Sequence, residues 1–283
     1  FSVPLSNSQV SIWNMDIGRC FIDYGKSYLL DFIHWEFFMT ETEKKNTFEA
    51  ILFDLDGTLL RANMQKFIPL YIRGLAAHCT ELVEPEKFER TLLTIIRELI
   101  HTEGDGSMTN EERVYTRMYQ ELALPKSMMD ESLAHLRENS LDELQEFVHP
   151  IPLAKQIVKD CQEKGIPLVL ATNPVFPKFM IQARMEWAEL EEDSFTYLTS
   201  YENSHYCKPH AGYFQAIAKQ LGIIPENCLM VGNDLSHDLA AAAVGMKTYL
   251  VDTWLVDRGG PEWPCDYRGD HSSLQQFLQE QLG

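Results

Sequence analysis

Residues 50–60 read AILFDLDGTLL, a short apolar run that ends in two aspartates and a glycine. The apolar run predicts a buried β-strand over residues 50–53. Because side chains alternate along an extended chain, Asp54 and Asp56 project to the same side beyond the end of that strand. Gly57 allows a sharp turn that leaves both carboxylates free to face a ligand. A hairpin at Asp56-Gly57 is disfavoured, since a helical region is expected to follow instead of a partner strand.

Four further apolar runs predict strands, and amphipathic stretches next to them predict helices. The strands are expected at Ile166–Ala171, Phe195–Thr199, Cys228–Val231 and Thr248–Val251. The helices are expected at 153–164, 176–189, 210–221 and 235–245, and a last short helix after the Gly- and Pro-rich stretch 259–270. This alternation is typical of an α/β fold with a parallel sheet and right-handed crossovers.

A long helical interval separates the first two strands and predicts an inserted domain. Pro85 is expected to open a helix that ends near His101. The patterns Thr109-x-x-Glu112 and Ser140-x-x-Glu143 both match a capping box at a helix start. Residues 104–107, Gly-Asp-Gly-Ser, interrupt the helical pattern and predict a loop. The predicted organisation is a catalytic core over 48–62 and 149–283, with a helical domain at 63–148.

Residues 1–47 form an N-terminal leader with neither clean periodicity nor turn signals. We expect the native protein to start at Met39, the upstream residues being foreign to it; the alternative is an arm that packs on the core. The apolar stretch 28–39 contains Asp31, His34 and Glu36, so neither a membrane span nor a signal peptide is expected.

The composition excludes several classes of function. Asp and Glu total 42 against 24 Lys and Arg, and a net charge of -18 disfavours nucleic acid and anionic membranes as partners. The six cysteines are scattered without a Cys-x-x-Cys pair, so neither a zinc site nor disulfides are expected, and a cytoplasmic location fits best.

Three more polar motifs follow the later strand candidates. Thr172-Asn173 comes after the second strand, and a hydroxyl with an amide can hold a phosphoryl oxygen. Lys208 precedes Pro209, which is expected to start a helix whose positive end would welcome phosphate. Asp234 ends the next strand, with Asp238 four residues on. Alone, these motifs would be interpreted as a turn, a solvated lysine and a helix cap.

The four motifs together resemble those of the haloacid dehalogenase superfamily, in the same order and over about residues 48–258. Each motif falls at the C-terminal end of a different strand candidate, where open α/β sheets bind ligands. The resemblance implies a Rossmann-like core with a helical, C1-type cap domain, and a phosphatase.

The resemblance also implies a mechanism. Asp54 attacks phosphorus to form an aspartyl-phosphate, and Asp56 protonates the leaving alcohol and later activates water. Thr172, Asn173 and Lys208 hold the other phosphoryl oxygens. The metal site, expected to bind Mg²⁺, consists of Asp54, the Asp56 carbonyl and Asp234, with Asp238 orienting a bound water or Lys208.

The substrate stays open at this stage. A small phosphorylated metabolite is expected, contacted by cap residues Arg113 and Arg117, which could equally be solvated on an outer helix face. A sugar-phosphate mutase would share all four motifs, and a non-catalytic regulatory or binding protein would keep the fold without turnover. Monomer and homodimer are both compatible with the sequence.

Overall fold

A computed structural model of the chain describes residues 47–283. The expectations for residues 1–46, including a start at Met39 and the absence of a membrane span there, lie outside the described residues. No helix within residues 47–283 combines the length and apolar character that crossing a bilayer requires.

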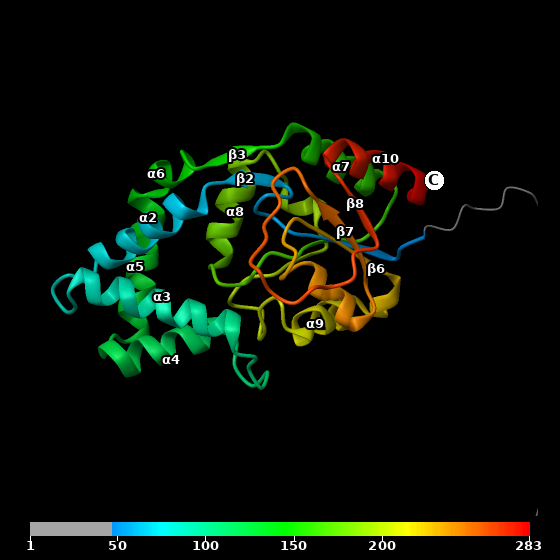
Figure 1. Cartoon of the computed structure of the whole chain (residues 1–283). Coiled ribbons are helices and arrows are strands. Elements are labelled where there is room, and N and C mark those ends of the chain that lie inside the picture. Colours follow the sequence, from blue (N-terminus) through cyan, green and yellow to red (C-terminus); the bar gives the residue numbers. More distant parts are fainter. Residues whose placement is uncertain (1–46) are drawn as a thin grey trace, which may run out of the picture. The chain divides into compact units, whose positions relative to one another are not determined.

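Within the described residues a six-stranded, all-parallel sheet has the strand order β5-β4-β1-β6-β7-β8 (Figure 1). Its strands are β1 (Ala50–Phe53), β4 (Leu168–Leu170), β5 (Tyr197–Leu198), β6 (Cys228–Gly232), β7 (Lys247–Val251) and β8 (Tyr267–Gly269). The five strands expected from the sequence are all present, and the α/β fold class is confirmed. The short edge strand β8 was not expected.

A separate two-stranded pair corrects one expectation. Residues 60–62 form β2 (Leu60–Ala62), which pairs antiparallel with β3 (Val148–Pro150) instead of entering a helix directly. The partners are three residues each and lie far apart in the sequence, so no local pattern could reveal them. Together they join the two ends of the helical segment that follows β2.

That helical segment, which we call the insertion, runs from residue 63 to residue 147. Thr109 makes the expected capping box with Glu112, whereas the Ser140 side chain caps nothing and precedes only a short helix. Residues 103–108 form the expected loop. The insertion contains α2 (Met64–Ala77), α3 (Pro85–His101), α4 (Asn110–Leu122), α5 (Lys126–Asn139) and α6 (Leu141–Gln145).

The helices of the core alternate with its strands, as predicted. One prediction was wrong in type: residues 235–245 contain only the 3₁₀ helix η3 (Leu239–Val244), because the Asp234 carboxylate accepts the Ser236 and His237 amides and holds them in a turn. The others are α7 (Pro152–Glu163), α8 (Lys178–Trp187), η1 (Glu192–Ser194), α9 (Ala211–Leu221), η2 (Pro225–Asn227) and α10 (His271–Leu282).

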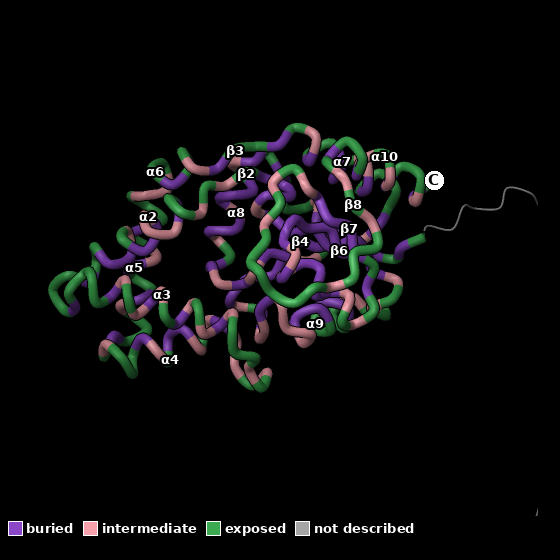
Figure 2. The backbone as a smooth tube through the Cα atoms, viewed as in Figure 1, coloured by how far each residue is buried: buried purple, intermediate pink, exposed green. Residues whose placement is uncertain are grey.

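The three central strands β1, β4 and β6 are buried at every residue, as their apolar sequences require (Figure 2). Ile51 and Phe53 of β1 belong to the apolar cluster that contains α7, α8, α10 and the insertion helices. Ala50 and Leu52 belong to the cluster on the other face, formed with α9 and η3. The side chains of β1 therefore alternate between the two clusters, one on each face of the sheet.

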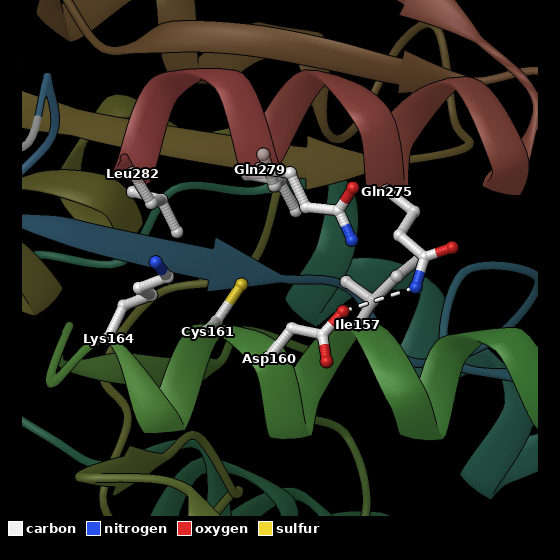
Figure 3. Close-up of a pocket in the computed structure, with 8 residues that line it drawn as sticks. Ile157, Asp160, Cys161, Lys164, Gln275, Gln279 and Leu282 are labelled. Atoms are coloured by element: carbon white, nitrogen blue, oxygen red, sulfur yellow. Dashed lines mark hydrogen bonds between the residues drawn. The ribbon is translucent and has the colours of Figure 1, made fainter.

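Helices α7 and α10 lie side by side over one face of the sheet and enclose a small cavity (Figure 3). Its volume of about 20 Å³ has room for about one water molecule. Gln275 of α10 donates to Asp160 of α7 across it. The cavity is thus a packing gap between two helices.

Loss of core volume in β1 should be costly. Leu52 is fully buried, so we expect Leu52→Ala to lower the free energy of unfolding by about 2–5 kcal/mol through lost burial and the cavity left behind. Urea denaturation would measure this. The control is Ile224→Ala at an exposed position, expected within about 0.5 kcal/mol of the wild type; equal effects at both sites would contradict the assignment of β1 to the core.

Candidate active site

The register of three neighbouring strands brings the sequence motifs to one edge of the sheet. Phe53 of β1 pairs with Leu170 of β4 and with Val231 of β6. The Asp54 amide donates to the Val231 carbonyl at 2.9 Å, and the Ala171 amide to the Phe53 carbonyl at 2.7 Å. The segments that start at Asp54, Ala171 and Gly232 therefore leave the sheet beside one another.

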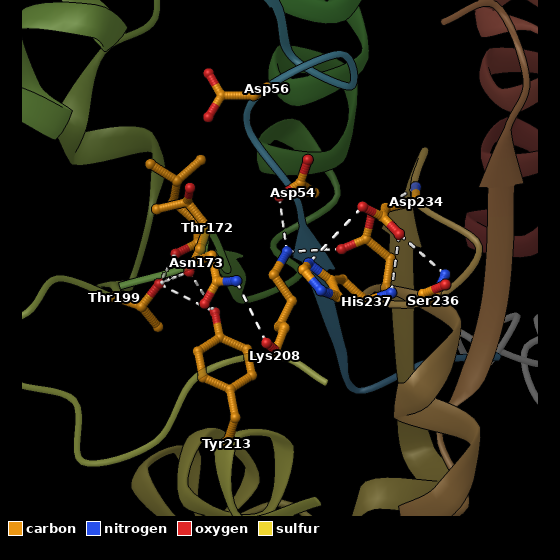
Figure 4. A network of polar contacts seen from close by, with 12 residues as sticks. Asp54, Asp56, Thr172, Asn173, Thr199, Lys208, Tyr213, Asp234, Ser236 and His237 are labelled. Atoms are coloured by element: carbon orange, nitrogen blue, oxygen red, sulfur yellow. Dashed lines mark hydrogen bonds and ion pairs between the residues drawn. The ribbon is translucent and has the colours of Figure 1, made fainter. Parts of the chain in front are cut away.

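Lys208 occupies the centre of this edge (Figure 4). Its side chain is buried, with the residue only 1% exposed, and its Nζ donates to Asp54 Oδ1 at 2.7 Å and to Asp238 Oδ1 at 2.6 Å. Burial alone would lower the pKa of Lys208, but Asp238 and Asp54 raise it above its ordinary value. The lysine is therefore a permanent cation that joins two of the sequence motifs.

The position of Lys208 corrects one expectation. Helix α9 begins at Ala211, not at Pro209, because the His210 amide donates to the Cys207 carbonyl and closes a turn before the helix. Lys208 thus stands ahead of that turn. Its ammonium is placed by the two carboxylates.

Asp238 is held on both oxygens by protein donors. Oδ1 accepts from Lys208, and Oδ2 accepts from the Asp234 amide at 2.9 Å. A Cβ on Gly232 would lie 2.2 Å from Asp238 Oδ2, so only glycine leaves room for this carboxylate. Asp238 therefore acts as a fixed anchor for the lysine and for the turn after β6.

Asp234 lies at the other side of the same turn. Its Oδ1 accepts the Ser236 and His237 amides, at 2.9 and 3.0 Å, and its Oδ2 pairs with Arg258 Nε at 2.5 Å. Burial lowers the pKa of His237 to about 4, so its ring is neutral near pH 7.

Thr172 and Asn173 are anchored by residues that sequence reasoning missed. The Thr172 carbonyl accepts from Thr199 Oγ1 and from the Tyr213 hydroxyl, both at 2.8 Å. Asn173 Nδ2 donates to the Lys208 carbonyl at 3.3 Å, while its buried Oδ1 has no partner among the described residues. The one feature of the sequence that could have indicated Thr199 is its position, a hydroxyl residue directly after the β5 strand.

Gly57 takes the sharp turn expected of it. Its φ is +88°, and a Cβ there would lie 2.1 Å from Asn233 Nδ2, which itself donates to the Trp254 carbonyl. The loop after β1 therefore packs directly on the loop after β6, which any larger residue would prevent.

Asp56 does not join the Lys208 cluster. Its carboxylate points away from Asp54 and Lys208 in Figure 4 and pairs with Arg184 of α8. Sequence reasoning missed Arg184, since a single arginine in an amphipathic helix gives no signal of its own.

The two arginines expected to contact substrate lie in the insertion, apart from the carboxylates. Arg113 donates to Asn110 Oδ1 and to the Thr102 carbonyl, next to the 103–108 loop. Arg117 pairs with Glu98 and Glu121 at the helix surface. Asn110, fully buried, donates to the Pro174 carbonyl and so connects the insertion to the loop after β4.

The site carries more buried negative than positive charge. Asp54, Asp234 and Asp238 are buried beside the single buried ammonium of Lys208. Burial, with Asp238 close by, raises the pKa of Asp54 to about 7. No group of three or more His, Cys, Asp or Glu side chains within residues 47–283 is spaced to hold a metal ion. A cation here would need carbonyl or water ligands besides Asp54 and Asp234.

The chain matches a known protein family. The model of the haloacid dehalogenase-like hydrolases matches residues 48–245, well over half of the chain. The chain belongs to this hydrolase family. The family membership and the prediction of an enzyme are thereby confirmed.

Relatives of this family match most of the chain. A ribulose-1,5-bisphosphate 5-phosphatase from Halopiger xanaduensis is 28% identical over 240 residues, 78% of this chain and 95% of that protein. The pyrophosphatase PpaX of Bacillus cereus is 24% identical over 211 residues, 74% of this chain and 85% of that protein. A HAD phosphatase structure from Thermococcus onnurineus, 19% identical, aligns with a TM-score of 0.51, covering 81% of this chain and 97% of that one, and shows the fold alone.

The raised pKa of Asp54 predicts a pH-dependent penalty on folding. Its carboxyl ionises near pH 3.8 when unfolded and near 7 when folded, so stability is lost as the pH rises between these values. We therefore compare the free energy of unfolding of Asp54→Asn with that of the wild type in EDTA. The difference should shift in favour of the variant by at least about 1 kcal/mol between pH 5 and pH 8. Urea denaturation at both pH values measures it.

The exposed Asp193→Asn is the control and should show no such pH-dependent gain. A gain of the same size at pH 5 and pH 8 for Asp54→Asn would contradict the raised pKa.

Proposed function

We propose that this protein is a Mg²⁺-dependent phosphatase that hydrolyses phosphate monoesters of small metabolites through an aspartyl-phosphate on Asp54. The observation that carries the proposal is the buried ammonium of Lys208, which holds Asp54 at the carboxyl edge of the sheet and leaves its Oδ2 without a partner among the described residues. That oxygen is free to attack an electrophile.

Attack by Asp54 needs the negative charge of the phosphate to be offset. Lys208, Asn173 and Thr172 would contact the non-reacting oxygens, since Lys208 pairs with Asp54 and the other two follow β4, the neighbour of β1 (Figure 4). Asp56 would protonate the leaving alcohol and afterwards take a proton from water. Because the Asp56 carboxylate points away from Asp54, it could act as acid and base while Asp54 acts as the nucleophile.

A divalent cation fits the donor set. Asp54, Asp234 and the Asp56 carbonyl offer hard oxygen ligands, and the excess of buried negative charge favours a cation. When bound, Mg²⁺ would supply charge stabilisation for the phosphoryl group. Asp238, which is 1% exposed and accepts from Lys208 and from the Asp234 amide, would orient Lys208. Asp234, whose oxygens also have protein donors, would have to exchange Arg258 for the cation.

The names of the relatives support phosphate chemistry. The ribulose-1,5-bisphosphate 5-phosphatase aligns with 78% of this chain and 95% of that protein, so the likeness is not confined to one short motif. The pyrophosphatase PpaX acts, by its name, on a different phosphate bond. Hydrolysis that releases phosphate is what the two names share; the bond cleaved and the specific substrate differ.

We further propose that the insertion is a cap domain over residues 63–148, and that residues 48–62 and 149–283 form the catalytic core. Arg113 and Arg117 would then contact the leaving group. The contact of Arg113 with the Thr102 carbonyl, at the base of the 103–108 loop, supports this role. Arg117 would have to exchange Glu98 for a substrate anion.

The test of the function is phosphate release from p-nitrophenyl phosphate by the purified chain, with Mg²⁺ and with EDTA. We expect release that requires Mg²⁺ and that Asp54→Asn lowers by at least about 10³-fold, because the nucleophile is lost. Asp193→Asn, an exposed aspartate, is the matched control and should keep full release. Retained turnover in Asp54→Asn would refute the nucleophile; no release with Mg²⁺ would favour the mutase or a non-catalytic protein.

The cap assignment has its own test. Alanine at Arg113 or Arg117 should change the ratio of kcat/KM among phosphorylated metabolites by about 10-fold, as expected for a lost hydrogen bond to a charged group. Release from p-nitrophenyl phosphate should stay within about 2-fold, and the exposed Arg97→Ala is the control. If all substrates fell together, the cap assignment would be wrong.

A further inference from the structure

Arg184 is a fully buried arginine whose only ion-pair partner within residues 47–283 is Asp56. A single nitrogen, Nη1, contacts both carboxylate oxygens, at 3.0 and 2.8 Å. The other donors, on Nε and Nη2, have no partner among the described residues. The guanidinium carbon lies 4.8 Å from the centre of the Phe176 ring and 5.8 Å from that of Phe67.

In this arrangement the Asp56 carboxylate is the main group that stabilises the buried positive charge of Arg184. An unpaired ion inside a protein costs several kcal/mol, and cation–π contact offsets only part of it. The attraction to Asp56 is strengthened by the low local dielectric. The Asp56 side chain, 25% exposed, is thus tied on one side to Arg184 and open to solvent on the other.

The ion pair with Arg184 fixes where the Asp56 carboxylate lies relative to the nucleophile Asp54. In an in-line displacement the leaving oxygen departs on the side of phosphorus opposite the attacking oxygen. An acid for that oxygen must therefore stand clear of Asp54. Asp56 does so, turned toward Arg184 and away from the Lys208 cluster (Figure 4).

The contact also involves the insertion. Phe67 belongs to α2, Phe176 follows β4, and their ring centres are 6.0 Å apart in an edge-to-face contact. Tyr71 of α2 packs on the same Phe176 ring at 5.1 Å. Arg184 is therefore enclosed by aromatic rings from both the core and the insertion, which leaves it little freedom.

We propose that Arg184 is the positioning residue of Asp56 and holds its carboxyl group in line with the leaving oxygen. The inference rests on the proposed phosphatase function. In the step concerned, an Asp54 oxygen bonds to phosphorus and the ester P–O bond breaks. Asp56, protonated from its solvent-exposed side, passes that proton to the departing oxygen and becomes the carboxylate that pairs with Arg184. Arg184 touches neither the substrate nor the phosphoryl group and acts through Asp56 alone.

The test compares kcat/KM for two aryl esters with different leaving groups, since this constant reports the first chemical step. p-Nitrophenyl phosphate releases a stable anion and needs little acid assistance; phenyl phosphate needs more. We expect Arg184→Met to raise the ratio of the two constants, p-nitrophenyl over phenyl, by at least about 10-fold. Asp56→Asn should raise it likewise.

The double variant separates positioning from a structural role. If Arg184 acts through Asp56, Arg184→Met should have almost no further effect on phenyl phosphate in an Asp56→Asn background. The control Arg137→Met removes an exposed arginine that lies 5.8 Å from the Phe179 ring, and should leave the ratio unchanged. Should Arg184→Met fail to fold by circular dichroism, Arg184→Lys is compared by the same ratios.

Two outcomes would overturn the proposal: equal losses for both esters, or effects of the two substitutions that add fully in the double variant. Failure of the phosphatase function is recognised separately, because the wild type would then release no phosphate from p-nitrophenyl phosphate with Mg²⁺. Loss of release in Asp54→Asn together with an unchanged ester ratio in Arg184→Met would refute only the role of Arg184.

Discussion

The buried ammonium of Lys208 is the contact on which the site depends. It joins carboxylates that follow two different strands, Asp54 after β1 and Asp238 after β6, at 2.7 and 2.6 Å. Without it, these carboxylates would repel each other in a low dielectric, and even with it burial, together with Asp238, raises the pKa of Asp54.

The parallel sheet makes this contact possible. Since β1 pairs in parallel with both β4 and β6, the chain leaves all three strands at the same edge of the sheet. Small residues allow the loops after β1 and β6 to pack closely there. Gly57 admits Asn233, and Gly232 admits the Asp238 carboxylate. Buried apolar strands thus provide the rigidity, and the loops beyond them provide the chemistry, with Thr199 and Tyr213 fixing the loop after β4.

Much of this architecture could be predicted because it rests on local pattern. The five strands, α3, the Thr109 capping box and the family were recognised from apolar runs, Pro85, Thr-x-x-Glu spacing and four ordered motifs. The two errors have different causes. Strand β2 pairs with the distant β3, a partner that no local window contains. The 3₁₀ helix η3 replaces an α-helix because Asp234 accepts amides only two and three residues along the chain, a local contact that competes with the helical pattern.

The sequence by itself determined the fold class, the family and the order in which the polar residues leave the sheet, because periodicity and motif spacing are written along the chain. Only the tertiary structure decided which charges meet. Lys208 lies 154 residues from Asp54, and Arg184 lies 128 residues from Asp56, yet each forms an ion pair in the fold. Burial and pairing of charges depend on three-dimensional packing. A sequence pattern therefore cannot identify the carboxylate that offsets the cost of burying an arginine.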